Sequence, residues 1–199
     1  RSADESPNAP QWRSVRGTNI DSVPVLQVHD GDWTSFRGDN ARSDVSNVAI
    51  PRAVRLKWTQ QICRDVLPTA PVTAGGMVFI ADRSGTLRAL DESGKLVWQA
   101  YTAGPIYYPP AIAHDRAFAG SADGRVYAFA AQDGRFLWSY CVAPNDRRIP
   151  VFEQLISAWP VAGGVVVDGR TVYAAAGIAH YDGTHVVALD AISGNLKAS

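Results

Sequence analysis

Two arginines and a tryptophan stand together in a stretch that breaks an otherwise regular repeat. The stretch covers residues 145–159 and reads NDRRIPVFEQLISAW, which includes Arg147, Arg148, Gln154 and Trp159. Two guanidinium groups can grip a carboxylate or a phosphate, and an indole offers a flat surface for stacking. Because insertions in a repeat array form loops on one face, often the binding face, these four residues are candidate ligand or partner contacts. The alternative is a solvated loop with one aromatic anchor.

A second, shorter insertion places imidazoles beside a carboxylate. Residues 176–181 read AGIAHY, and His180 and His185 flank Asp182. These groups are metal ligands in other proteins, but the set is incomplete here. Side chains on such a turn more often cap the backbone or face solvent. We therefore predict no metal site and keep His180 as a candidate partner contact.

The sequence lacks the arrangements typical of nucleophilic enzymes and nucleotide-binding proteins. No Ser/His/Asp or Cys/His set has a supporting context, and no glycine-rich phosphate loop leads from a strand into a helix. We predict no catalytic residue in this chain. The two cysteines, Cys63 and Cys141, lie about two repeats apart, too far for a disulfide that needs Cα atoms within about 7 Å. We expect both to be free thiols.

The composition is that of a globular protein with a sizeable core. Of 199 residues, 46% are hydrophobic and 19% charged, and the formal net charge is +0. A neutral chain has no overall electrostatic reason to bind nucleic acid. No apolar run approaches the roughly 20 residues that a transmembrane helix needs, so we predict no membrane-spanning segment.

A 40-residue period in the tryptophans predicts the fold. Trp58, Trp98 and Trp138 are 40 residues apart, and short β-rich runs separated by Gly, Asp and Ser turns lie between them. In the first unit the runs are Met77–Ala81, Thr86–Leu90 and Leu96–Trp98. Four strands in about 40 residues, repeated, are typical of a β-propeller blade. We predict an all-β propeller of four-stranded antiparallel blades with almost no helix; a solenoid is the competing repeat fold.

The repeated turn residues have an architectural explanation. A glycine permits the positive φ of a tight turn, and an aspartate can accept hydrogen bonds from its own turn backbone. A tryptophan can bury its ring against the next blade while its N–H finds one acceptor. We therefore predict that the residues at these positions join blade to blade. They are Trp58, Trp98, Trp138, Asp91, Asp190, Gly94, Gly134 and Gly194.

The same phrase resembles the tryptophan-docking repeat of PQQ-like, quinoprotein-type β-propellers. It appears as Ala89-Leu90-Asp91…Gly94…Trp98, then as Ala128-Phe129-Ala130…Gly134…Trp138, then as Ala188-Leu189-Asp190…Gly194 with Ala198 in place of the tryptophan. The opening segment DWTSFRGDN, residues 32–40, followed by Leu56-Lys57-Trp58, is also similar to that of quinoprotein dehydrogenases and of the outer-membrane-assembly propeller lipoprotein. The resemblance covers residues 32–199 and implies a ring of seven or eight blades.

The resemblance also bears on cofactors. Quinoprotein dehydrogenases of this family use adjacent cysteines above the PQQ cofactor and acidic ligands around calcium. This chain has no Cys-Cys pair, and none of its acidic residues can be matched to the calcium ligands. We expect no cofactor in this chain. The alternative is PQQ with calcium in the complete protein, at a site that lies mostly outside this chain.

The repeats divide the chain into a tail and a partial ring. We predict a tail or linker over residues 1–31 and a partial propeller over 32–199, with blades at about 59–99, 100–139 and 140–199. Three units are too few to close a ring. We therefore expect a fragment of a larger propeller, or a partner chain that covers the open edge.

These observations favour a non-catalytic propeller outside the cytoplasm that binds a protein or polymer, or serves as an assembly scaffold. We expect a periplasmic or extracellular location, with or without membrane association. Two alternatives stay open. One is a fragment of a PQQ-dependent oxidoreductase, and the other is a sensor or binding domain fused to an enzyme or cytochrome.

Overall fold

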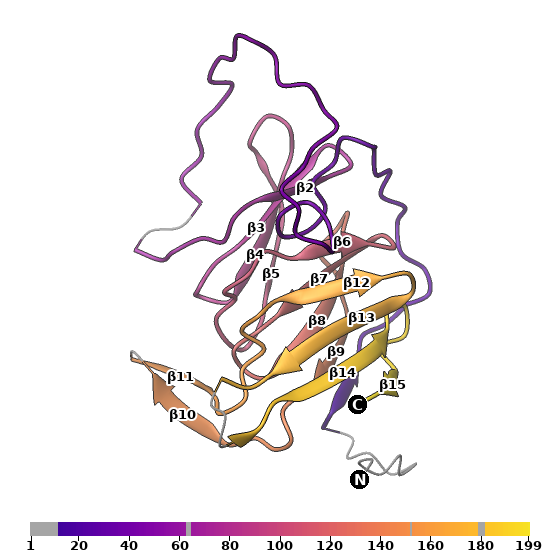
Figure 1. Cartoon of the computed structure of the whole chain (residues 1–199), viewed down its shortest axis with the longest axis vertical. Helices are drawn as coiled ribbons and strands as arrows, with labels where there is room; N and C mark the ends of the chain where they lie inside the picture. Colours follow the sequence, from indigo (N-terminus) through magenta and orange to yellow (C-terminus); the bar gives the residue numbers. More distant parts are fainter. Residues whose placement is uncertain (1–11, 63–64, 152, 179–181) are drawn as a thin grey trace.

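The computed structural model describes residues 12–62, 65–151, 153–178 and 182–199, and these residues form β-strands joined by turns. The first sheet contains β2 (Val72–Ala74), β3 (Met77–Ala81), β4 (Thr86–Leu90) and β5 (Leu96–Tyr101). The second contains β6 (Ala111–Ala113), β7 (Arg116–Gly120), β8 (Arg125–Ala130) and β9 (Phe136–Cys141). The third contains β12 (Val165–Asp168), β13 (Thr171–Ala176), β14 (His185–Asp190) and β15 (Leu196–Ala198). The strands of each of these three sheets follow one another in chain order and pair antiparallel. Figure 1 shows the sheet of β6–β9 between the sheets of β2–β5 and β12–β15. The predicted all-β fold with four-stranded blades is confirmed.

The repeat sequence explains why the three sheets share one geometry. In each sheet the third strand shifts its register against the fourth near its end, between Ala89 and Leu90, Ala128 and Phe129, or Ala188 and Leu189. Such a bulge bends a strand and increases its twist. The turn that follows contains the motif glycine at positive φ. The Ala-Leu-Asp…Gly phrase is therefore a bulge followed by a tight turn.

The core consists of two layers, one on each face of the second sheet. Between the first and second sheets, Phe79 and Leu87 are fully buried, and between the second and third, Phe118 and Leu189 are. Every residue of β7 is buried, whereas the outer sheets keep exposed apolar side chains on β5 and β14. The second sheet is thus buried on both faces, as an internal blade of a propeller is.

The segment that we predicted as a tail or linker packs against the second sheet in its described part. Strand β1 (Ser14–Arg16) pairs with the outer strand β9, with Val15 opposite Ser139, and makes that sheet five-stranded. Arg135 and Arg116 then donate to backbone carbonyls of residues 18–22. Because these contacts involve the backbone, the side chains of residues 12–25 carry little pattern that sequence analysis could detect. The boundary at residue 31 stays a prediction.

An inserted hairpin precedes the third sheet. It consists of β10 (Arg148–Val151) and β11 (Gln154–Ser157), antiparallel, and projects at the lower left of Figure 1. Within the described residues, no helix is long and apolar enough to cross a membrane.

Candidate functional site

Each repeat tryptophan contacts the next sheet in the same way. The indole N–H of Trp98 donates to the carbonyl of Ala131 at 2.9 Å, and that of Trp138 donates to Ala191 at 3.3 Å. Trp58, which precedes the first sheet, donates to the carbonyl of Glu92 at 2.9 Å. Both Trp98 and Trp138 are buried, so each fills space between two sheets.

The motif glycines lie directly beneath these rings. A Cβ at Gly94, Gly134 or Gly194 would lie 2.6 Å from a ring carbon of the tryptophan that contacts it, and all three residues have positive φ. Only glycine fits both conditions without a shift of backbone or ring. The motif therefore combines a tight turn with a close approach between neighbouring sheets.

The motif aspartates bind their own turns. Asp91 accepts hydrogen bonds from the amides of Ser93 and Lys95, at 2.8 and 3.0 Å, and its pKa is lowered by the hydroxyl of Ser93 and by these amides. Burial opposes ionisation of Asp190, but hydrogen bonds from Ser193 and Arg170 outweigh it, so the pKa of this carboxyl lies well below its usual range. These carboxylates stabilise turns and are not free for other ligands.

Arg147 connects the first insertion to Asp182, the residue that follows the second insertion. Its guanidinium donates to the carboxylate of Asp182 at 2.6 Å and lies 4.7 Å from the centre of the Trp159 ring. The Trp159 indole donates to the Asp182 carbonyl at 2.7 Å, and His185 packs edge-on against the same ring. Because this carboxylate is paired with an arginine, the cluster is suited to hold the base of the hairpin.

Arg148 and Gln154 lie on the hairpin itself. Arg148 pairs through Nε with Asp146 at 3.1 Å and is exposed. Arg147 and Arg148 thus pair with different carboxylates of this chain, Asp182 and Asp146. They do not point together at a shared site for one anion. Gln154 donates to the carbonyl of Arg83 at 3.4 Å, so the hairpin reaches the β3–β4 turn of the first sheet. His180 lies outside the described residues.

A pocket of about 200 Å³ opens beside Arg148. Its lining comes from the residue range before β1, the loop between β5 and β6, the second sheet and the base of the hairpin: Trp12, Ala103, Asp123, Arg125, Tyr127, Cys141, Asp146 and Arg148. Tyr127 donates to the buried carboxylate of Asp123, and burial raises the pKa of this phenol. Cys141 is a free cysteine, and burial raises the pKa of its thiol, which favours the protonated form. Cys63 lies outside the described residues.

Sequence reasoning missed most of this pocket. Asp123, Arg125 and Tyr127 belong to the regular second repeat and carry no mark that separates them from blade residues. Trp12 offered one signal, because it is the sole aromatic residue of types Phe, Trp and Tyr in residues 1–31. The contact of residues 12–16 with β9 brings it to the pocket.

The face around the hairpin combines apolar and charged surface. Leu155 of β11 is 59% exposed, and Ile178, in the second insertion, is exposed to the same extent. In the view from below, polar surface predominates, and an apolar area lies at the left, the side on which Figure 1 places the hairpin. We call the hairpin, the Arg147 cluster and the pocket the hairpin face.

The family model for "Outer membrane protein assembly factor BamB" matches residues 43–199. A protein of that name from Burkholderia pseudomallei is 28% identical over 160 residues, which is 72% of this chain and 41% of the relative. One from Nitrosomonas eutropha is 25% identical over 122 residues, 61% of this chain and 26% of the relative. The chain therefore spans well under half the length of these relatives.

Solved structures show the same fold. Quinohemoprotein alcohol dehydrogenase ADHIIG from Pseudomonas putida HK5 superposes with a TM-score of 0.70 at 19% identity, over 84% of this chain and 26% of that one. BamB from Moraxella catarrhalis gives a TM-score of 0.50 at 25% identity, over 63% of this chain and 38% of that one. With the family match across most of its length, the chain belongs to the PQQ-like β-propeller family described as outer membrane protein assembly factor BamB.

Proposed function

We propose that this chain is part of a non-catalytic scaffold propeller that acts in the periplasm in outer membrane protein assembly and binds a partner protein through the hairpin face. The relatives named as assembly factors support the process. One observation supports partner binding at this face. The hairpin that breaks the repeat is held by contacts among Arg147, Trp159 and Asp182, yet its Leu155 side chain is exposed.

The physical features of this face suit a protein ligand. Interfaces gain affinity from apolar anchors that fill pockets, with charged residues around them. Here Leu155 is an anchor from this chain, and the pocket of about 200 Å³ offers room for an anchor from the partner. Arg148 borders that pocket and is exposed, so it is a charged residue in a position to contact the partner.

The test is site-specific photo-crosslinking in the source bacterium. A photoreactive amino acid at position 155 should give a discrete adduct whose partner is identified by mass spectrometry, and Leu155→Asp should lower outer membrane protein levels. The matched control is position 133, an exposed turn residue at the other end of β8 from the pocket. Equal adducts at 133 and 155, or normal outer membrane protein levels in the Leu155→Asp strain, would contradict the proposal.

A cofactor-dependent oxidoreductase is the competing function. The described residues do not fit PQQ with calcium, because Cys141 has no neighbouring cysteine and no three His, Cys, Asp or Glu side chains gather in this part of the chain. The likeness to the dehydrogenase supports the fold alone, since the two chains are 19% identical. Dye-linked alcohol oxidation by the full-length protein with added PQQ and calcium would favour the enzyme.

A further inference from the structure

The segment that contains residues 33–44 fastens the inner strands of all three sheets. The Trp33 carbonyl accepts from the amide of Thr73 in β2, and the Thr34 carbonyl accepts from the amide of Ile112 in β6, both at 2.8 Å. The Asn40 side chain donates to the carbonyl of Val167 in β12, also at 2.8 Å. We call residues 33–44 the inner loop. Its attachment to three sheets holds it in a fixed position.

The inner loop is also braced internally. Arg37 donates to Asp44 at 2.6 Å, and Asp39 accepts from the amide of Ser43 at 3.0 Å. Arg37, Arg42 and Asp44 all adopt positive φ, between 55° and 63°. Side chains of these types rarely take that conformation, and it persists where the surrounding contacts impose it. The bracing fixes the direction in which the Arg42 side chain leaves the loop.

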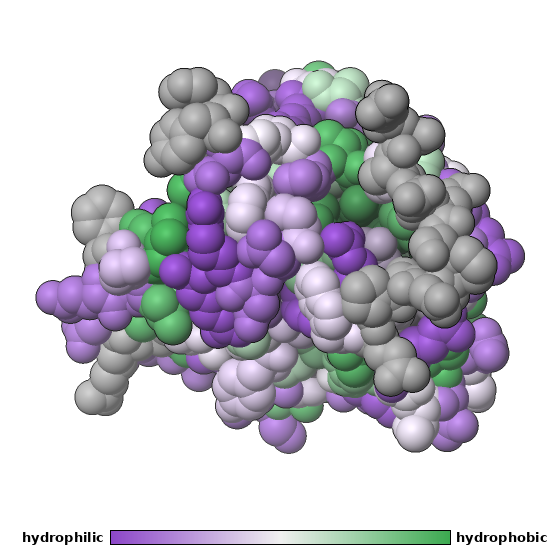
Figure 2. Space-filling model, turned by 90° about the horizontal axis from the view of Figure 1, so that it is seen from below, coloured by the Kyte–Doolittle hydropathy of each residue, from purple (hydrophilic) through white to green (hydrophobic). Residues whose placement is uncertain are grey.

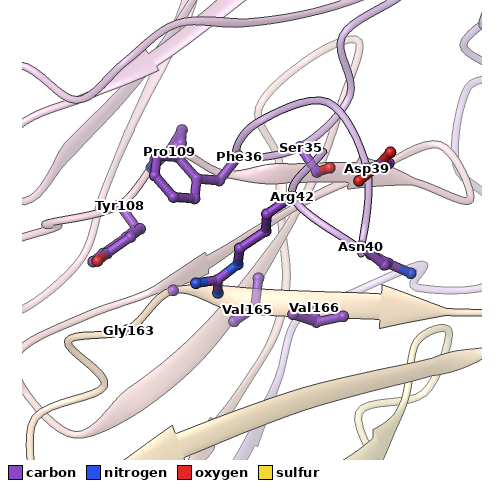
Figure 3. A pocket seen from close by; sticks show the side chains of 11 residues that line it. Ser35, Phe36, Asp39, Asn40, Arg42, Tyr108, Pro109, Gly163, Val165 and Val166 are labelled. Carbon is purple, nitrogen blue, oxygen red and sulfur yellow. The ribbon is translucent and has the colours of Figure 1, made fainter. Parts of the chain in front are cut away.

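Arg42 differs from the other charged residues of the loop. Within the described residues its side chain makes no hydrogen bond and no ion pair, and its guanidinium carbon lies 5.5 Å from the centre of the Phe36 ring. Figure 3 shows the side chain running away from Asp39 and ending between Tyr108 and the start of β12. Phe36 and Tyr108 meet edge to face at 5.0 Å and wall one side. A guanidinium with five donors is therefore held open toward this cleft.

Backbone at the start of the third sheet also lines the cleft. Gly163 and Gly164 precede β12. A Cβ at Gly164 would lie 2.9 Å from the Cβ of Tyr108, whereas a Cβ at Gly163 would meet no atom of the described residues within 4 Å. A ligand can thus approach the backbone closely there. The space in the cleft is about 10 Å³, room for roughly one water-sized group. One oxygen atom of a ligand group can therefore enter it, while the rest of the ligand stays outside the cleft.

We propose that the cleft between Arg42, Tyr108 and Gly163–Gly164 binds the carboxylate group of a ligand. Arginine matches the planar geometry of a carboxylate with two parallel N–H donors. Arg42 is exposed, and the contact of its guanidinium with the Phe36 ring helps to hold it beside the cleft. The source of the group is a chain-terminal carboxylate or an acidic side chain of a polypeptide. This site does not involve the hairpin face, so either one can fail without the other.

The test uses small probes and the full chain. ¹⁵N NMR titration with N-acetyl-leucine should give saturable shifts at the Arg42 Nε and the Gly163 and Gly164 amides, with a Kd of about 1 mM for a single arginine contact. N-acetyl-leucine amide and inorganic phosphate should bind at least ten-fold more weakly. N-acetyl-glutamate amide, with its carboxylate on the side chain, tests the second source. Shifts of equal size with the uncharged amide or with phosphate would overturn the carboxylate assignment.

Variants locate the site. Arg42→Gln should abolish the shifts, Arg42→Lys should weaken binding several-fold because it keeps the charge without the fork, and Arg55→Gln, at an exposed arginine outside the cleft, should change nothing. Binding that survives Arg42→Gln places the probe elsewhere and refutes the proposal. If Arg42→Gln fails to fold, the comparison of acid, amide and phosphate on the unmodified chain still decides it.

Discussion

At the scale of single residues, the repeat tryptophans and motif glycines have complementary shapes. Trp98 is 7% exposed, and its ring lies over Gly134 in the next sheet, with its N–H bonded to Ala131. One indole thus contributes apolar area, a hydrogen bond and a close fit at once. A change to either member of the pair removes the fit, so both substitutions should destabilise the protein.

Truncation of the buried indole tests this role. Trp98→Ala should lower the free energy of unfolding by about 3–5 kcal/mol, because it removes a buried aromatic side chain and leaves a cavity. Urea unfolding followed by circular dichroism measures the change. Trp12→Ala is the matched control, since Trp12 is 41% exposed and its loss should cost far less. A cost for Trp98→Ala below about 1 kcal/mol would refute the docking role.

The glycine beneath that ring supplies a second measurement. Gly134→Ala should destabilise by about 1–3 kcal/mol, because the new Cβ meets the Trp98 ring at 2.6 Å and the backbone has a φ of 72°. Gly183→Ala is the control: its φ is 77°, but a Cβ there meets no atom of the described residues within 4 Å. The difference between the two variants isolates the clash with the ring from the backbone cost. Equal losses in urea unfolding would mean that the ring does not press on Gly134.

Asp190 links the same motif to pH. Its folded pKa lies below the unfolded value of 3.8, so its contribution to stability is fully present above that value and is lost as pH falls toward the folded pKa. Thermal unfolding at a series of pH values from 6 down to about 2 should therefore show a smaller acid-induced loss in Asp190→Asn than in the unmodified chain. An identical slope for Asp190→Asn and the unmodified chain would contradict this assignment.

At the scale of elements, the strands repeated from blade to blade were predictable and the unique ones were not. The expected runs Met77–Ala81 and Thr86–Leu90 are strands β3 and β4. Their alternating side chains are anchored by glycine turns that recur every 40 residues. Strand β1 has three exposed residues and is held through its backbone, so it carries no such pattern. The hairpin β10–β11 was expected only as a loop, because its pairing exists once in the chain.

The candidate site divides along the same line. Composition and the broken period indicated Arg147 and Trp159, and the structure brings them together with Asp182. Their mutual contacts could not be predicted, because they depend on two insertions separated by strands β12 and β13. Arg42 was not singled out, since it differs from Arg37 of the same loop in having no side-chain hydrogen bond or ion pair within the described residues, which the sequence does not reveal.

The contrast between neighbouring arginines tests how the hairpin is held. Arg147→Ala should speed hydrogen exchange at amides of residues 148–157 and lower stability by about 0.5–1 kcal/mol, because it removes an exposed ion pair and a cation–π contact. Arg148→Ala should leave exchange unchanged, since Arg148 pairs only with Asp146 beside it within the described residues. Faster hydrogen exchange after Arg148→Ala, or unchanged exchange after Arg147→Ala, would contradict the prediction that Arg147 holds the hairpin.

At the scale of the whole molecule, the three sheets differ in what covers them. The second sheet is buried on both faces, and β1 covers its outer edge. The first and third sheets keep apolar side chains exposed on their outward faces, among them Val97 and Val186. Family membership supplies the reason: propeller blades are covered by neighbouring blades. The second sheet, with both faces covered by neighbouring sheets, therefore shows how each blade of a closed propeller ring is buried.

The cover on that sheet's edge has a consequence for association. Uncovered strand edges pair with other chains, and β1 occupies the edge of β9. A chain that starts at residue 18 loses β1, and analytical ultracentrifugation should show more self-association than a chain that starts at residue 12. Both chains lack residues 1–11, so the comparison isolates residues 12–17. Removal of β1 exposes the backbone edge of β9, and we expect dimers to form through this edge. Ser139→Pro in the shorter chain should reduce dimer formation, because proline has no N–H to donate to a strand of the second chain. Equal sedimentation of the two chains would show that the edge of β9 does not associate without β1, and would contradict the prediction.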